Sequence, residues 1–286
     1  MKKIIIVLLI LLALVLGLFF YIKFYSSNKF QIIFLNVGQG DSALIKFRNG
    51  EKMLVDCGPD RKILSKLGQY LPFYDRTIDV LLVTHPDLDH YGGCADILKR
   101  YQVKKIITNG EIKDSDPFFQ VWQKMVMQEN AENLVVFYPE EIIIASTTFK
   151  FLSPDNSLGL EDKIKEGNNN SIVFQLQDLA VGKVLFTGDM ELPLENALLT
   201  KYCPDFTSST LPCPSLQSDY LKVGHHGSDS SSGDNFLQAV NPKVSIISVG
   251  KNTFGHPSFR VLRHLERAGT VIWRTDEKND IIIGEN

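Results

Sequence analysis

The chain has 286 residues, of which 44% are hydrophobic and 22% are charged. This composition suits one large globular domain with an ample core and excludes a disordered protein. Without the three lysines of residues 1–25, the rest of the chain carries 27 basic and 33 acidic side chains, a net charge of −6. This balance excludes a strongly basic protein that binds nucleic acid nonspecifically.

An uncharged run from Ile4 to Ile22 follows two lysines near the N-terminus and is ended by Lys23. Nineteen residues at about 1.5 Å each approach the roughly 30 Å hydrocarbon core of a bilayer. No small-x-small cleavage pattern follows, so we expect an uncleaved signal anchor over residues 1–25. The lysines before the run outweigh Lys23, which predicts that the folded domain, residues 30–286, lies outside the cytoplasmic membrane.

Alternating and helical hydrophobic patterns then predict a mixed order of strands and helices. The expected strands are 31–37, 42–48, 52–56, 78–84, 104–108, 134–137, 142–144, 148–152, 171–176, 183–187, 220–223, 244–249, 271–274 and 280–283. The expected helices are 61–70, 93–100, 118–130, 191–201, 235–240 and 258–268. This order predicts an α/β (α+β) fold in which two mixed sheets lie between layers of helices.

The most informative stretch is THPDLDHYGG, residues 84–93, directly after an apolar run. The predicted strand delivers His85 to its C-terminal edge, and alternation lets His85 and Asp87 face the same way. Asp89 and His90 then point at a second position nearby. Imidazole with carboxylate suits zinc, iron or manganese, so the stretch predicts a two-metal hydrolytic centre.

The remaining histidines support this prediction. Five of the six sit in glycine- or proline-marked loops after apolar runs, namely His85, His90, His225, His226 and His256. Only His264 falls inside a helical pattern, on a polar face with three arginines, and we interpret it as an ordinary surface residue. Another carboxylate, Asp189, follows the predicted strand 183–187 and is placed at a strand edge.

No pair of the four cysteines has metal-finger spacing. In an exported domain Cys203 and Cys213 would close a small disulfide, worth about 2–3 kcal/mol by loop entropy. In a cytoplasmic domain they would be free thiols. We expect Cys57 and Cys94 to be small core residues rather than ligands.

Six motifs occur along residues 30–284: FLNVGQGDS (34–42), VDCG (55–58), HPDLDHYGG (85–93), LFTGD (185–189), LKVGHHGS (221–228) and GHP (255–257). Together they resemble the metallo-beta-lactamase superfamily, and within it most closely the soluble hydrolase domain of ComEC-type DNA-uptake proteins. The resemblance implies an αββα sandwich with two metal ions at one edge of the paired sheets.

The resemblance also implies a role for each candidate residue, with zinc or manganese as the metal. His85 and Asp87 would hold the first ion; Asp89, His90 and His256 the second; Asp189 would bridge them; Asp56 would orient ligands. A metal-activated water would be the nucleophile. His225, His226 and Asp89 are the catalytic candidates, and one of the paired histidines, His225 above all, is an alternative ligand in place of His256.

Two departures from the wider superfamily affect the first ion. Asp87 stands where a second histidine is usual, and no histidine lies between His90 and His225. The segment NNNS, residues 168–171, occupies roughly the place of the missing ligand, as is common in ComEC-like domains, which makes Asn170 and Ser171 supporting candidates. A site richer in oxygen favours manganese over tight zinc binding.

The resemblance implies a membrane-anchored phosphodiesterase or nuclease that acts on DNA, such as single-stranded DNA, near the cell surface. Two alternatives remain: an exported esterase or phosphodiesterase for small or cell-wall phosphoesters, and a weakly catalytic binding protein with the same fold. Because the sequence has one candidate span, DNA transport would need a separate channel protein.

Overall fold

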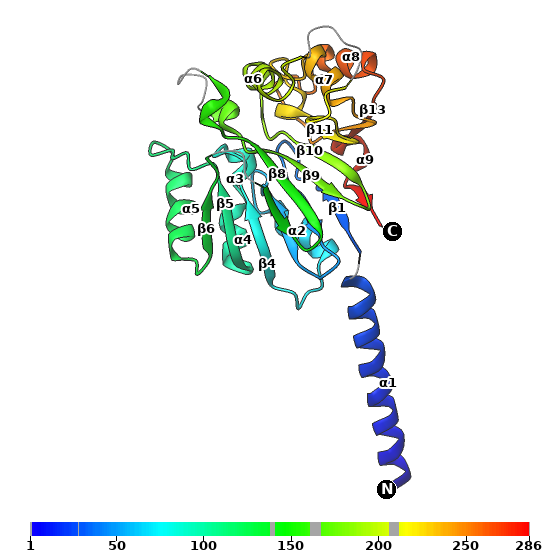
Figure 1. The fold of residues 1–286 in the computed structure, drawn as a ribbon. Helices are drawn as coiled ribbons and strands as arrows, with labels where there is room; N and C mark the ends of the chain where they lie inside the picture. Colours follow the sequence, from blue (N-terminus) through cyan, green and yellow to red (C-terminus); the bar gives the residue numbers. More distant parts are fainter. Residues whose placement is uncertain (1, 28, 138–140, 161–166, 206–211, 286) are drawn as a thin grey trace.

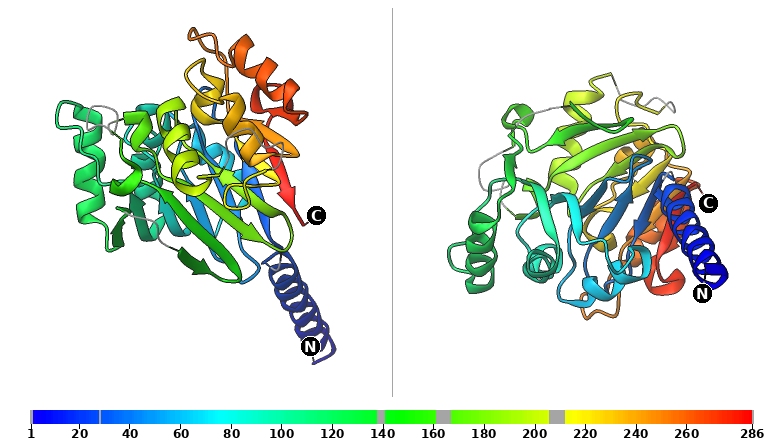
Figure 2. Two further views of the ribbon diagram at one scale, coloured as in Figure 1. Left: turned by 45° about the horizontal axis from the view of Figure 1, so that its top comes forward. Right: turned by 90° about the horizontal axis from the view of Figure 1, so that it is seen from below.

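The computed structural model describes residues 2–27, 29–137, 141–160, 167–205 and 212–285. Figure 1 shows a long helix, α1 (Lys2–Ser27), projecting from a layered domain. In two further views, α1 leaves the domain beside the strand that carries the C-terminus (Figure 2). One window of α1, Lys2–Phe19, is long and apolar enough to cross a membrane.

The first sheet contains seven strands. In spatial order they are β14 (Ile281–Gly284), β1 (Gln31–Phe34), β2 (Ala43–Lys46), β3 (Lys52–Val55), β4 (Thr77–Leu82), β5 (Gln102–Thr108) and β6 (Glu132–Val135). From β3 to β6 the strands are parallel, so their carboxyl ends meet at one edge of the sheet.

The second sheet also contains seven strands. In spatial order they are β13 (Val271–Arg274), β12 (Val244–Ile247), β11 (Tyr220–Lys222), β10 (Gly182–Phe186), β9 (Val173–Asp178), β8 (Thr147–Ser153) and β7 (Glu141–Ile144). The four strands from β10 to β13 are parallel. Each sheet is therefore mixed, as predicted.

Helices cover the outer face of each sheet. Beside the first sheet lie α2 (Lys62–Tyr70), α3 (Leu88–Tyr91), α4 (Cys94–Arg100) and α5 (Pro117–Gln128). Beside the second lie α6 (Leu192–Tyr202), α7 (Asp234–Val240), α8 (Phe259–Arg267) and the short α9 (Thr275–Lys278). Every predicted element is present with its ends within three residues, and α3 and α9 are additional helices.

Three apolar layers hold these elements together. The layer between the sheets includes Phe34, Phe186 and Phe174. The Phe186 ring stacks on Phe34 at a centroid separation of 5.5 Å and on Phe174 at 4.7 Å. A second layer joins the first sheet to α2, α4 and α5, and a third joins the second sheet to α6, α7 and α8. This arrangement confirms the predicted αββα sandwich.

Two disulfides cross-link the domain. Cys203 pairs with Cys213, as expected for an exported domain. The expectation for Cys57 and Cys94 was incomplete: they are fully buried, but they form a disulfide that ties the loop after β3 to the start of α4. The interpretation of His264 as an ordinary surface residue was wrong, because its Nδ1 lies 3.0 Å from the Ser232 carbonyl and its side chain is 14% exposed.

Candidate metal centre

The candidate site lies where parallel strands of both sheets end. Asp56 directly follows β3, His85 follows β4 by three residues, and Asp189 follows β10 by three residues. The paired histidines 225 and 226 lie in a 3-10 turn, Gly224–Gly227, just after β11. Because the carboxyl ends of parallel strands share an edge, residues far apart in the sequence converge there.

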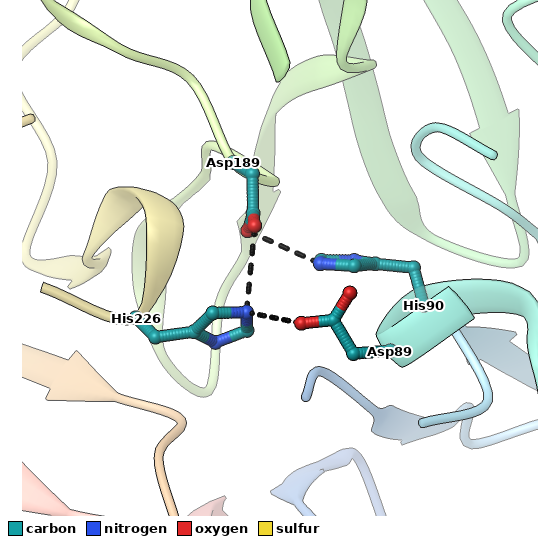
Figure 3. Close-up of side chains that lie close together, drawn as sticks. All are labelled: Asp89, His90, Asp189 and His226. Atoms are coloured by element: carbon teal, nitrogen blue, oxygen red, sulfur yellow. Dashed lines mark hydrogen bonds and ion pairs between the residues drawn. The ribbon is translucent and has the colours of Figure 1, made fainter. Parts of the chain in front are cut away.

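Four side chains form a compact cluster, with donor atoms that all lie within 4.8 Å of one another. They are Asp89, His90, Asp189 and His226 (Figure 3). Asp189 stands between the two rings: one carboxylate oxygen lies 3.2 Å from His90 Nε2 and the other 3.4 Å from His226 Nε2. Asp89 approaches the same nitrogen of His226 at 3.0 Å.

The other ring nitrogen of each histidine is already engaged. His90 Nδ1 lies 2.9 Å from Asp56 Oδ2, and His226 Nδ1 lies 2.8 Å from the Ser248 carbonyl. Both partners accept hydrogen bonds, so in the neutral form of each ring Nδ1 carries the proton and Nε2 is the nitrogen left to bind a metal. This tautomer is the one that a metal ligand needs.

Two of the predicted ligands flank the cluster on one side. His85 is fully buried, its ring lies 4.2 Å from that of His90, and its Nε2 is 3.6 Å from Asp87 Oδ2. Asp87 also forms an ion pair with Lys113. Burial opposes ionisation of Asp87, yet His85 and Lys113 hold the pKa of its carboxyl well below the usual range.

On the other side lie the two remaining histidines. His225 Nε2 is 3.9 Å from Asp189 Oδ2, and His225 Nδ1 is 3.1 Å from Glu191 Oε1. The His256 ring lies 5.4 Å from His225 and 6.4 Å from His226, and its buried Nδ1 has no hydrogen bond. The structure thus gathers all five loop histidines at one edge, with His226 rather than His256 against Asp89 and Asp189.

Two contributors, Asp41 and Lys222, were not among the residues assigned to the site from the sequence. Lys222 Nζ forms an ion pair with Asp41 and lies 3.7 Å from Asp189 Oδ1, and Asp41 Oδ1 lies 3.3 Å from His226 Nδ1. Asp41 is part of the FLNVGQGDS motif, but its position in a glycine turn gave no sign that the turn folds back onto the site. Lys222 ends β11 and is 3% exposed.

The side chains of the cluster and its neighbours carry an excess of negative charge. Asp41, Asp56, Asp89 and Asp189 carry four negative charges against the single positive charge of Lys222, a balance of −3. Burial opposes protonation of His90 and His226, but the carboxylates around them, Asp189 above all, raise both pKa values well above the usual range.

Unpaired polar atoms show that the residues fit a metal. The buried atoms His85 Nε2, His90 Nε2, Asp189 Oδ1 and His256 Nδ1 have no hydrogen-bond partner among the described residues. Buried nitrogen and oxygen atoms without partners are costly, and here they converge on one region. A nitrogen and carboxylate donor set of this kind suits zinc, manganese or iron.

The supporting candidates hold the edges of the site. Asp56 accepts hydrogen bonds from Thr84 N and Thr84 Oγ1, each at 2.8 Å, as well as from His90. Ser171 Oγ accepts from the Asp189 backbone N–H at 3.1 Å. Asn170 is farther out: its side-chain amide donates to Glu111 at 3.0 Å.

The backbone adopts left-handed conformations at three of these positions. φ is +57° at Asp56, +47° at His225 and +53° at His226. Such values cost about 1–3 kcal/mol for residues other than glycine and recur at functional sites. Gly227 continues the left-handed turn at φ +79°, where a Cβ would approach Pro257 to 2.7 Å.

Comparison with known proteins agrees with this architecture. A model of the metallo-beta-lactamase superfamily matches residues 35–251. Among curated proteins, ComE operon protein 3 of Bacillus subtilis is 29% identical over 274 residues, covering 89% of this chain and 33% of that protein. Competence protein ComA of Neisseria gonorrhoeae is 28% identical over 253 residues, covering 87% of this chain and 31% of that protein. The chain spans about a third of the length of these relatives.

Among solved structures, the metallo-beta-lactamase fold protein YhfI from Bacillus subtilis superposes with a TM-score of 0.56 at 12% identity. The match covers 90% of this chain and all of YhfI. At this identity the similarity shows a shared fold.

Proposed function

The chain belongs to the metallo-beta-lactamase superfamily, and from this premise we propose that it is a metal-dependent phosphodiesterase that cleaves DNA outside the cytoplasmic membrane. The observation that carries the proposal is the position of Asp189. One of its carboxylate oxygens lies 3.2 Å from His90 Nε2, and the other lies 3.4 Å from His226 Nε2. A carboxylate with both oxygens beside metal-binding nitrogens can contact two ions at once, which is the role a bridging ligand has in a two-metal site.

The candidate donors form one compact cluster with Asp189 and a second pair beside it. Asp89, His90 and His226 lie on one side of the site, and His85 with Asp87 lie next to His90. His225 and His256 complete the rim. Apart from His225, these residues would hold two divalent ions, zinc or manganese. When bound, the ions would supply a nucleophile at neutral pH and neutralise charge on the phosphate.

The chain's own residues prepare and protect this chemistry. Asp56 and Ser248 fix the tautomers of His90 and His226. Asp41 and Lys222 form a buried ion pair next to Asp189 and His226. His225 has a side chain 24% exposed, and its Nδ1 lies against Glu191, so its Nε2 is the reachable atom that would donate a proton to a leaving oxygen.

DNA is proposed as the substrate because of the relatives. Proteins named for competence match this chain over most of its length, and competence is the uptake of DNA. Two-metal centres are suited to in-line displacement at phosphorus, the reaction that phosphodiester cleavage requires. A separate channel protein is proposed as the partner of this chain in DNA transport.

The location is part of the same proposal. Residues 1–25 would anchor the chain, and residues 30–286 would form the hydrolase domain on the outer side of the membrane. The two disulfides support this orientation, because disulfides persist in oxidising compartments outside the cytoplasm.

Cleavage of single-stranded DNA by the purified full chain, with manganese or zinc added to metal-free protein, tests the proposal. The Asp189→Ala variant should lose at least 100-fold in rate, a loss of roughly 3 kcal/mol in transition-state stabilisation. Asp276→Ala, which removes an exposed carboxylate paired with Arg274, serves as the matched control and should retain full rate.

Two further substrates separate the alternatives. A bis-aryl phosphodiester turned over without DNA cleavage would identify a small-phosphoester hydrolase. Metal binding with no turnover of DNA, phosphodiester or a lactam reporter would identify a binding protein and overturn the proposal.

A further inference from the structure

The end of the first sheet opposite the candidate metal centre carries a second surface of interest. Because β3, β4 and β5 are parallel, their amino-terminal ends gather there. Eight positions separate Thr77, at the start of β4, from His85, and at an extended rise this places the two ends of the strand about 26 Å apart. A groove of 640 Å³ opens at this end. Its lining includes Lys46, Lys52, Tyr74, Arg76 and Lys104.

A loop beside the groove, residues 71–76, exposes two aromatic side chains. Phe73 is 82% exposed and Tyr74 is 48% exposed, and their rings meet edge to face at 5.5 Å. The Tyr74 ring also lies 6.0 Å from the ring of Phe19 in α1. Figure 1 shows α1 leaving the domain at this end, away from α3 and the site.

The contact with Phe19 fixes the depth of the loop relative to the apolar run. Phe19 lies three residues before the run ends at Ile22, about 4.5 Å along the helix axis. A ring in contact with Phe19 is therefore level with the boundary between hydrocarbon and head groups. Aromatic side chains concentrate at this boundary in membrane proteins because one part of the ring is apolar and its edge tolerates water.

Positive charge accompanies the aromatic pair. Lys52 lies 2.9 Å from Asp75, and Lys104 lies 2.7 Å from Asp79. Lys46 approaches Gln31 rather than a carboxylate, at 3.4 Å. Burial lowers the pKa of Lys46, and the neighbouring ammonium groups of Lys52 and Lys29 lower it further. The groove is lined by four basic side chains and three acidic ones, Glu51, Asp75 and Asp79, which leaves one positive charge in excess. Anionic lipid head groups are attracted to such a surface.

We propose that this end of the domain docks on the surface of the membrane that α1 enters, with Phe73 and Tyr74 in the interface and Lys46 beside anionic head groups. The docking would fix the direction of the domain, so that the candidate metal centre faces away from the bilayer. A lipid of the anchoring membrane would then lie about 26 Å from the site, by the strand-length estimate above, and could not be its substrate. This inference does not depend on phosphodiesterase activity.

Fluorescence quenching by lipid tests the docking. The full chain carrying Phe73→Trp is reconstituted into vesicles of phosphatidylcholine and phosphatidylglycerol whose acyl chains are brominated close to the head group. Bromine quenches only tryptophan within contact range of the lipid. The signal of the unsubstituted chain, which has Trp122 and Trp273, is subtracted.

Two matched variants calibrate the result. Phe118→Trp replaces a ring that is 71% exposed at the start of α5, on the end of the sheet that carries the site. Phe19→Trp reports on α1 itself. Several-fold stronger quenching of Phe73→Trp than of Phe118→Trp, with Phe19→Trp also quenched, would support docking. Equal quenching at 73 and 118, or no quenching at 19, would overturn it.

The charge contribution has its own measurement. Raising the fraction of phosphatidylglycerol should increase quenching of Phe73→Trp, and adding Lys46→Gln should remove most of that increase. A response to phosphatidylglycerol that is unchanged by Lys46→Gln would overturn the role of Lys46. Activity is not read in any of these experiments, so a failed nuclease assay leaves their outcome intact.

Discussion

Asp56→Asn is the sharpest test of how the candidate site is organised. Asp56 accepts from Thr84 N with one oxygen and from Thr84 Oγ1 and His90 Nδ1 with the other. The substitution changes one oxygen to an amino group and keeps the size of the side chain. Asparagine also tolerates the left-handed backbone at this position, φ +57°, so little strain is added.

Either orientation of the new amide leaves one donor unpaired. If its oxygen faces Thr84 N, its amino group meets the Nδ1–H of His90. His90 can then move its proton to Nε2, but that atom faces Asp189 at 3.2 Å and can no longer bind a metal. If the amide is turned over, the backbone N–H of Thr84 loses its acceptor. A buried donor without a partner costs about 1–3 kcal/mol, which converts to a loss of about 5–150-fold in metal affinity.

Metal affinity is measured by competition with a chromophoric chelator at pH 7.5, using the full chain in detergent. Ser42→Ala is the control, because Ser42 donates to the Asp56 carbonyl at 2.9 Å and is equally buried, but has no contact with His90. It should lose about 1 kcal/mol of stability and keep its metal affinity. Equal affinities for Asp56→Asn, Ser42→Ala and the unsubstituted chain would refute the tautomer argument.

Two further predictions concern stability. Burial raises the pKa of Glu195 to about 7, although the backbone N–H groups of Gly233 and Ser232 donate to it. Between pH 4.5 and 7 the folded chain therefore retains a proton that the unfolded chain releases. The free energy of unfolding falls by about 3 kcal/mol as pH rises through this window. Between pH 5 and pH 8, urea unfolding should show a fall that is about 3 kcal/mol larger in the unsubstituted chain than in Glu195→Gln. Parallel pH profiles would contradict the assignment. The two disulfides should differ in how much they stabilise the fold, because Cys57–Cys94 spans 37 residues and Cys203–Cys213 spans 10. Loop entropy predicts that replacing each pair by alanine lowers the free energy of unfolding by about 4 and 3 kcal/mol respectively. Denaturant unfolding of the two double variants measures these losses. A larger loss of unfolding free energy on replacing Cys203 and Cys213 would contradict a loop-entropy origin.

The sequence predicted the fold closely because hydrophobic period and turn residues are local signals. The strand 78–84 and the ligand motif after it could be recognised together, since one stretch carries both. Contacts between segments that are far apart in the sequence have no such local signal. Cys57 and Cys94 looked like separate core residues because nothing local shows that the loop after β3 meets the start of α4. Asp41 and Lys222 were not assigned to the site for the same reason, being 181 positions apart yet joined in one ion pair.

The histidines show the limit most clearly. His225 and His226 are adjacent, and an extended backbone would point their side chains in opposite directions. The structure instead turns both residues, and Gly227 after them, into the left-handed region. Both rings consequently approach Asp189, His226 at 3.4 Å and His225 at 3.9 Å. No periodicity in the sequence encodes this turn, although Gly227 marks where it would end.

The same turn explains why the site and the fold depend on each other. Left-handed residues at 225 and 226 are unfavourable in isolation, and the contacts that hold them are the Ser248 carbonyl against His226 and Glu191 against His225. Ser248 follows β12 and Glu191 precedes α6, so both restraints come from neighbouring elements of the second sheet. Asp56, the third left-handed residue, is restrained by Thr84 across the first sheet. Strain at the site is thus balanced by hydrogen bonds from both sheets, and the cluster forms only when the two sheets are packed together.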